Sequence, residues 1–189
     1  MNRYFFEISY LGTSYHGWQR QNGQTSVQQC IEESLSKFIP QKELKIVGCG
    51  RTDTGVHAKQ YFFHFDTENT LPQQTHFKIN TILPKDIAVN GIYKSKTNQH
   101  ARFDATQRTY RYYLHQKKDA FINKTSLYYK PKLDLELMQK AAQLLLGKKE
   151  FTSFAKLHAD NKTDFCTLTH AQWNQTKNQI YCLDQIMQF

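Results

Sequence analysis

Runs in which apolar and polar residues alternate limit the folds open to this chain. In the first run, Tyr4, Phe6 and Ile8 share one face of an extended backbone, while Phe5 and Glu7 share the other. A period of two is typical of a strand with one buried face. Further strands are predicted at 44–47, 60–65, 87–95, 108–114, 167–175 and 179–189, with a turn at 176–178 between the last two.

The first half of the chain combines such strands with two predicted helices. The longer helix runs from about 26 to 38, with apolar residues three and four apart on one stripe. Thr25 or Ser26 can cap it. A shorter helix lies around 76–83 and is closed by Pro84. This order predicts a small α/β domain with a mainly antiparallel sheet.

The second half repeats the outline of the first, with a strand, a loop, a helix and then further strands. Its helix is predicted to begin near Asp134, a favourable N-cap, and to end at Gly147. The stripe expected to pack on the sheet consists of Leu137, Ala141, Leu144 and Leu145. We therefore predict an α+β fold with two similar α/β domains, 1–98 and 99–189, whose sheets lie side by side with basic loops along the seam.

A polar, glycine-rich segment, Gly48–Ala58, follows the predicted strand at 44–47. Its three glycines, Gly48, Gly50 and Gly55, leave the backbone few steric limits. The segment also holds Arg51, Asp53 and His57. Catalytic groups are often mounted on loops between sheet elements, so Asp53 is a candidate nucleophile or general base. The alternative is a plain turn, which the segment taken alone favours.

Several side chains elsewhere have two interpretations. Trp18 is expected to fill the edge of the core, whereas Arg20 and Gln21 are expected to face phosphates or a base. His64 is expected to be an exposed strand residue. The strand at 108–114 has tyrosines on one face and arginine on the other, which suits RNA stacking. The same pattern is equally typical of an ordinary strand, and the residue spacing does not distinguish an RNA-binding strand from a purely structural one.

The charge of the chain bears on its partner. There are 25 Lys and Arg against 16 Asp and Glu, a net charge of +9. Such a surplus favours a polyanion, because phosphates attract cations and release counterions on binding. A basic surface that only aids solubility fits the charge equally well. Aromatic residues, 14% of the chain, shift the balance towards RNA because they supply stacking surfaces.

Cysteine usage and hydropathy exclude other classes of protein. The four cysteines are scattered, without ligand spacing, so neither a metal site nor a disulfide framework is expected. No apolar run reaches the length of a membrane span, and Met1 is followed at once by a strand pattern. We therefore expect no signal peptide, no membrane association and a cytoplasmic location.

The segment Gly50–Ala58 resembles the signature of the tRNA pseudouridine synthase A family. Further matches follow in the family's order along almost the whole chain. They are Tyr10-Leu11-Gly12-Thr13, Gly17-Trp18-Gln19-Arg20-Gln21, Asn80–Pro84, Asp86-Ile87-Ala88-Val89, His100-Ala101-Arg102-Phe103, Arg108–Tyr112, Leu145-Leu146-Gly147 and Phe151-Thr152-Ser153-Phe154.

The resemblance implies isomerisation of uridine to pseudouridine in tRNA, without a cofactor. Asp53 matches the family's catalytic aspartate, which attacks either the ribose C1′ or the uracil ring. Tyr110 matches the tyrosine that stacks on the target base, and Arg51 the arginine that helps to hold the flipped-out nucleotide. The expected phosphate or sugar contacts are Arg20, Arg102, Arg108 and Arg111. Gly50, Gly55 and His57 are expected to support the loop, His57 through hydrogen bonds.

The resemblance also implies two domains that face a deep basic cleft, and a homodimer that holds one tRNA. The implied targets are uridines at positions 38–40 of the anticodon stem-loop. The family pattern continues beyond Phe189 into a helix with a Met-Val-Arg-type motif and a closing strand. We therefore expect a truncated chain whose second domain is incomplete and whose Asp53 lacks its arginine partner. The alternative is a non-catalytic RNA-binding module that keeps the basic cleft.

Overall fold

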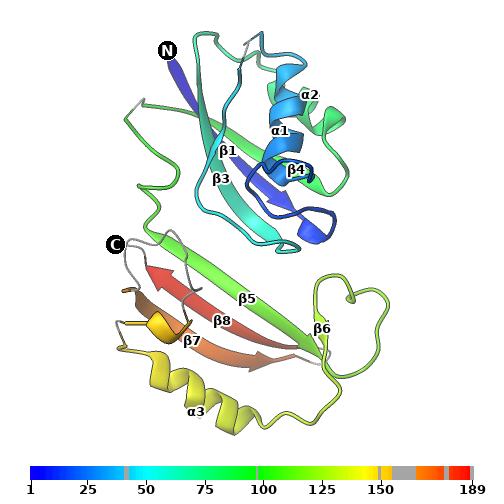
Figure 1. Cartoon of the computed structure of the whole chain (residues 1–189), viewed down its shortest axis with the longest axis vertical. Helices are drawn as coiled ribbons and strands as arrows, with labels where there is room; N and C mark the ends of the chain where they lie inside the picture. Colours follow the sequence, from blue (N-terminus) through cyan, green and yellow to red (C-terminus); the bar gives the residue numbers. More distant parts are fainter. Residues whose placement is uncertain (41–42, 97, 149, 155–164, 177–178, 188–189) are drawn as a thin grey trace. The chain divides into compact units, whose positions relative to one another are not determined.

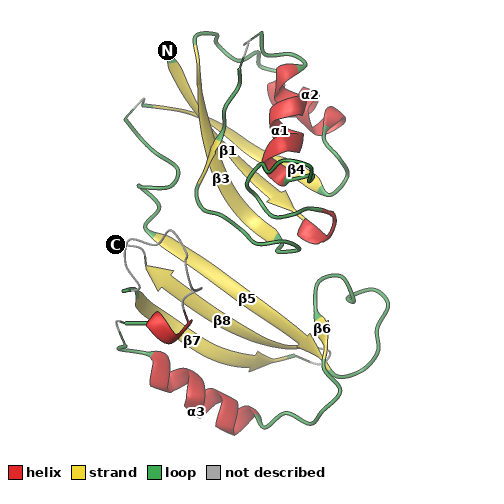
Figure 2. Ribbon diagram, viewed as in Figure 1, coloured by secondary structure: helices red, strands yellow, loops and turns green. Residues whose placement is uncertain are grey.

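The computed structural model describes residues 1–40, 43–96, 98–148, 150–154, 165–176 and 179–187. The chain divides into two compact units, Met1–Ala105 and Thr106–Phe189. Each unit has a four-stranded, mainly antiparallel sheet with helical segments, which confirms the predicted α+β class (Figures 1 and 2). Parts of the expected turn at 176–178 and strand at 179–189 lie outside the described residues.

The sheet of the first unit has the order β2-β3-β1-β4, and all its pairs are antiparallel. These strands are β1 (Asn2–Tyr10), β2 (Val47–Gly48), β3 (Ala58–Thr67) and β4 (Ile87–Ser95). The strand expected at 44–47 is thus wrong in its bounds, because the two-residue β2 shares only Val47 with it. Leu44 and Ile46 are nevertheless buried, because they pack into the core just before β2 begins.

Helices α1 (Val27–Ser36) and α2 (Thr75–Ile82) cover one face of this sheet and share a single core with it. Phe6 of β1 stacks on Phe63 of β3 with ring centroids 5.0 Å apart. Ser26 caps α1 as predicted, since its side chain accepts a hydrogen bond from the Gln29 N–H at 3.2 Å. A short 3-10 helix, η1 (Gly12–Ser14), follows β1.

The segment 99–105, assigned to the second domain on sequence grounds, packs with the first unit. It covers His64 of β3, which is only 3% exposed, so the expectation of an exposed strand residue is wrong. The Nδ1 atom of His64 accepts the Ala101 N–H at 3.2 Å, and its ring contacts those of Phe5 and His100. Burial, followed by the charges of Arg3 and His100, lowers the pKa of His64 to about 4.

The sheet of the second unit has the order β6-β5-β8-β7. Its strands are β5 (Gln107–His115), β6 (Leu127–Tyr128), β7 (Thr167–Gln175) and β8 (Ile180–Met187). The pair β5–β6 is parallel, and the others are antiparallel. The two-residue strand β6 has no counterpart in the sequence prediction. A second 3-10 helix, η2 (Thr152–Phe154), precedes β7.

Helix α3 (Leu135–Leu145) begins after Asp134 as predicted, because that carboxylate accepts the Leu137 N–H at 3.0 Å. The predicted packing stripe of Leu137, Ala141, Leu144 and Leu145 is wrong except for Leu145. Leu137 and Leu144 are 61% and 73% exposed, whereas Ala142 is buried against Leu168 and Ala171 of β7.

The contacts between α3 and β7 explain this rotation of the helix. Gln139 accepts the Trp173 N–H at 2.9 Å, and Gln143 donates to the Ala171 carbonyl oxygen at 3.4 Å. Among the described residues β7 is the last strand of its sheet, so one edge of its backbone faces away from β8. The two glutamines bond to backbone groups of β7 and therefore turn this face of α3 towards the sheet.

Candidate active site

Two loops of the first unit are joined by hydrogen bonds. The aspartate loop, 48–58, leads into β3, and the support loop, 11–26, connects β1 to α1. The Trp18 N–H donates to the Thr52 carbonyl oxygen at 3.1 Å, and the Gly55 N–H donates to that of Tyr15 at 3.2 Å. Each loop therefore supplies backbone partners to the other, an arrangement that fixes both conformations.

His57 adds a third connection between these loops. Its Nδ1 accepts the Gly12 N–H at 2.9 Å, which makes it a hydrogen-bonded brace. A Cβ at Gly12 would lie only 1.9 Å from the Val56 carbonyl oxygen. A Cβ at Gly17, where φ is +78°, would lie 2.3 Å from the Thr52 carbonyl oxygen. Glycine is required at both positions because the two backbones approach so closely.

Helix α1 holds the support loop in turn. The N–H groups of Val27 and Gln28 donate to the carbonyl oxygens of Gly17 and Trp18, at 3.2 and 3.0 Å. Trp18 is fully buried, which confirms its expected core role. The centroid of its ring lies 4.3 Å from that of the Tyr61 ring. The support loop is thus anchored both by its backbone and by a large side chain in the core.

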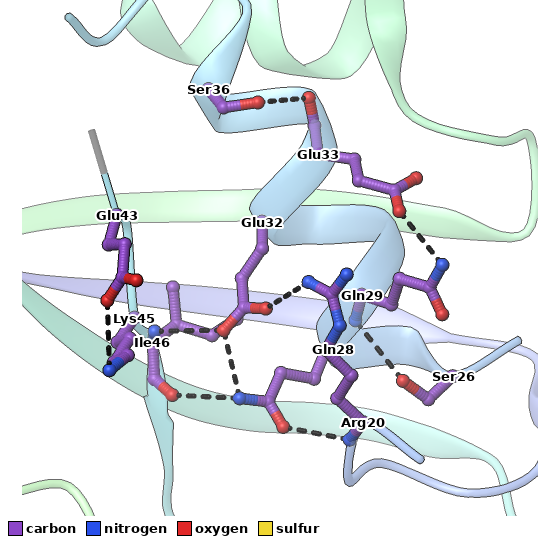
Figure 3. Close-up of polar contacts among 10 residues, drawn as sticks. All are labelled: Arg20, Ser26, Gln28, Gln29, Glu32, Glu33, Ser36, Glu43, Lys45 and Ile46. Atoms are coloured by element: carbon purple, nitrogen blue, oxygen red, sulfur yellow. Dashed lines mark hydrogen bonds and ion pairs between the residues drawn. The ribbon is translucent and has the colours of Figure 1, made fainter. Parts of the chain in front are cut away.

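Glu32 of α1 connects the support loop to the chain that enters the aspartate loop (Figure 3). This carboxylate, 8% exposed, accepts hydrogen bonds from Gln28 Nε2 at 2.9 Å and the Ile46 N–H at 3.2 Å. Its other oxygen forms an ion pair with Arg20 Nη1 at 3.2 Å. The Arg20 side chain remains 54% exposed, so it can also contact a ligand.

The hydroxyl groups of two buried tyrosines, Tyr61 and Tyr10, form hydrogen bonds with the aspartate loop. Tyr61 donates to the Gly50 carbonyl oxygen and accepts the Gly50 N–H at 3.4 Å. The Tyr10 hydroxyl bonds to Thr52 Oγ1 at 3.0 Å, and burial raises the pKa of Tyr10 to about 12. Sequence reasoning missed both tyrosines. The available signal was a tyrosine on the buried face of a strand, where its hydroxyl needs a partner.

Asp53 lies in the exposed part of the aspartate loop, and its carbonyl oxygen accepts the Val56 N–H at 3.2 Å. Arg51 is likewise exposed. The structure thus places a solvent-accessible carboxylate on a segment fixed by several partners. Such a carboxylate is chemically suited to act as a nucleophile or a base.

The remaining sequence-predicted residues fall into two groups. Arg102 is exposed in the first unit, where its guanidinium lies 5.9 Å from the centre of the Phe103 ring. Arg108, Tyr110 and Arg111 all belong to β5 of the second unit. Tyr110 is exposed on that strand, as is its neighbour on the same face, Tyr112.

The described residues contain no group of three or more histidine, cysteine, aspartate or glutamate side chains placed to hold a metal ion. In the same part of the chain, no helix combines the length and apolar character needed to cross a membrane.

Comparison with known proteins identifies relatives along nearly the whole chain. A sequence model described as tRNA pseudouridine synthase matches residues 8–104. The tRNA pseudouridine synthase A of Bacteroides thetaiotaomicron is 43% identical over 180 residues, which are 95% of this chain and 66% of that protein. The proteins of the same name from Parabacteroides distasonis and Vibrio cholerae are 46% and 40% identical, over 93% and 95% of this chain. These alignments span 70% and 68% of the two relatives, so the chain covers about two thirds of their length.

Proposed function

The chain belongs to the tRNA pseudouridine synthase A family, and on that premise we propose that it isomerises uridine to pseudouridine in tRNA with Asp53 as nucleophile. The reaction breaks the bond between ribose C1′ and uracil N1 and forms one between C1′ and C5. The proton on C5 is lost and N1 takes up a proton, so the product is an isomer of the substrate and the step needs no redox cofactor. An accessible carboxylate can attack C1′ or the ring, and the exposure of Asp53 is the observation that supports this role.

The fixed aspartate loop supports the same proposal on energetic grounds. A nucleophile acts efficiently when its position is set before the substrate arrives, because little entropy is then lost at the reacting centre. Asp53 has this property through the bonds that its neighbours Thr52 and Gly55 make to the support loop.

The target uridine has to leave the RNA stack before Asp53 can reach it. We assign Tyr110 to stacking on the flipped-out base and Arg51 to holding it there. Arg20, Arg102, Arg108 and Arg111 are assigned to phosphate or sugar contacts, in keeping with the net charge of +9. We further propose that the protein has a basic cleft, modifies uridines at positions 38–40 of the anticodon stem-loop, forms a homodimer and acts in the cytoplasm.

Release of tritium from tRNA labelled at uracil C5 tests the chemistry, because pseudouridine formation removes that hydrogen. We expect release with the unmodified chain and a loss of at least about 1,000-fold in Asp53→Asn, in line with removal of other covalent nucleophiles. Asp134→Asn is the matched control, since asparagine keeps the cap of α3 and Asp134 lies in the other unit.

Absence of release from the unmodified chain, or equal release from Asp53→Asn, contradicts the proposal. Filter binding of the same tRNA to the same samples shows which alternative then holds. Retained binding without release identifies a non-catalytic RNA-binding module.

A further inference from the structure

Positive charge is concentrated in one segment outside the residues assigned so far. The stretch 116–132, here called the lysine arm, contains Lys117, Lys118, Lys124, Lys130 and Lys132 and a single acidic residue, Asp119. Its surplus of four positive charges is nearly half of the chain's net +9. All five lysines are exposed. A clustered surplus of this kind indicates a polyanionic partner more strongly than an evenly basic surface does.

The base of the lysine arm is tied to the sheet of the second unit. β6 pairs in parallel with the end of β5, and the Tyr129 N–H donates to the His115 carbonyl oxygen at 2.9 Å. The buried His115 ring hydrogen-bonds to the buried Ser126 hydroxyl at 3.1 Å. Gln116 Nε2 also donates to the Pro131 carbonyl oxygen at 2.8 Å. The two ends of the arm are therefore held together by hydrogen bonds at the end of β5. Figure 1 shows the loop between them extending beyond the strands.

The tip of the arm presents an aromatic ring to solvent. Asp119 accepts the Phe121 N–H at 2.8 Å, and Thr125 donates its N–H to the Ile122 carbonyl oxygen at 2.9 Å. These bonds shape the turn on which Phe121 lies, 98% exposed. Water solvates a phenyl ring poorly, so a ligand that covers Phe121 would gain free energy from its burial.

We propose that the lysine arm binds the RNA substrate, with its lysines on phosphates and Phe121 stacked on an unpaired base. A groove or loop that combines cations with an exposed ring suits single-stranded nucleic acid, since every base offers a π-face. The arm leaves β5 five residues after Tyr110, about 17 Å along an extended strand. An RNA whose target base stacks on Tyr110 therefore reaches the arm a few nucleotides away. This inference rests on the proposed function and adds a second contact region to it.

Salt dependence of tRNA binding tests the lysines. A triple variant, Lys117→Ala/Lys118→Ala/Lys130→Ala, is compared with Lys37→Ala/Lys78→Ala/Lys85→Ala, which removes the same charge from exposed positions of the first unit. Each lost phosphate contact lowers the slope of log K against log salt by about 0.7 to 0.9. We expect the slope to fall by about 2 to 3 in the arm variant and to change little in the control. Equal slopes in the two triple variants overturn the proposal.

Stacking is tested separately at the tip. Phe121→Ala is expected to raise Kd for tRNA on the order of 5- to 100-fold without changing the salt slope, while Phe121→Trp retains affinity. The exposed ring is not part of the core, so both variants are expected to fold, as far-UV circular dichroism will show. Unchanged affinity in Phe121→Ala overturns the stacking role. Altered sedimentation of that variant with unaltered RNA binding identifies a self-association surface instead and also overturns it.

Tritium release keeps this inference separable from the proposed function. If tritium release is absent but the salt slope of tRNA binding still depends on the arm, RNA binding by the arm is supported and the proposed isomerisation is rejected. If tritium release persists but tRNA binding is unchanged by substitutions in the arm, the RNA-binding role of the arm is rejected and the proposed isomerisation stands.

Discussion

Replacing Gly17 by alanine tests whether the support loop positions Asp53. Gly17 and Gly23 lie in the same loop with nearly equal backbone angles, φ +78° and +74°. Alanine in the left-handed region costs on the order of 1–2 kcal/mol, and the two variants share this cost. They differ in their surroundings, because a Cβ at Gly23 meets nothing within 4 Å, whereas one at Gly17 lies 2.3 Å from the Thr52 carbonyl oxygen.

The size of the expected effect follows from that 2.3 Å distance. Real Cβ atoms essentially never approach another heavy atom within 3.0 Å, so Thr52 has to move by about 0.7 Å or more. The obstructing atom is backbone next to Asp53, so the displacement is passed directly to the carboxylate. A misplacement of about 1 Å in a catalytic group costs on the order of 100-fold in rate. We therefore expect kcat/KM of Gly17→Ala to be about 10- to 100-fold below that of Gly23→Ala.

The assay is tritium release at 25 °C under kcat/KM conditions, with the free energy of unfolding of both variants measured in urea. Comparing the two alanine variants removes the shared backbone strain from the result. If kcat/KM of Gly17→Ala lies within about threefold of Gly23→Ala while both are folded, contact between the loops does not position Asp53.

Three further outcomes are expected for the stability of the first unit. Glu32→Ala leaves the Ile46 N–H without its partner and Arg20 without its counter-charge, so the free energy of unfolding in urea should fall by about 2–3 kcal/mol; Glu32→Gln should lose less. Ser26→Ala removes the cap of α1 and should cost about 1 kcal/mol in the same titration. The pKa of His64 is about 4 in the folded chain and near 6.5 when unfolded, so the unfolded state binds more protons between these values. Stability should therefore fall by about 2 kcal/mol from pH 7.5 to pH 5, and His64→Asn, which keeps an acceptor for Ala101, should flatten that dependence.

The sequence predicts well what depends on neighbours along the chain. Burial of one face forces a period of two, so β1, β3, β4 and β5 are found from alternation alone. The caps Ser26 and Asp134 are likewise local, since each side chain bonds an N–H three residues later. The glycines and polar residues of the aspartate loop are neighbours in sequence, so they indicate the loop for the same reason.

What the sequence does not predict depends on distant partners. His64 is buried by a segment that begins some 35 residues later, so no periodicity within β3 reveals its environment. The face of α3 that packs depends on β7, because the Trp173 N–H and the Ala171 carbonyl oxygen bond to Gln139 and Gln143 of the helix. In the sequence, Glu32 is indistinguishable from an ordinary charged residue on the exposed face of a helix. Its role depends on its contacts with Ile46 and Arg20, which only the fold brings next to it.

The bonds between the aspartate loop and the support loop have a consequence for the RNA. Trp18 and Gly55 donate across the two loops in opposite directions, so neither loop can open without breaking the hydrogen bonds of both. Amide hydrogens at these two positions should then exchange together, in one cooperative event. In the proposed reaction, loops joined in this way yield little to a bound tRNA, so we expect the distortion that brings uridine to Asp53 to fall on the nucleic acid. Stem-loops that unstack easily should therefore be modified faster than stiff ones carrying the same uridine.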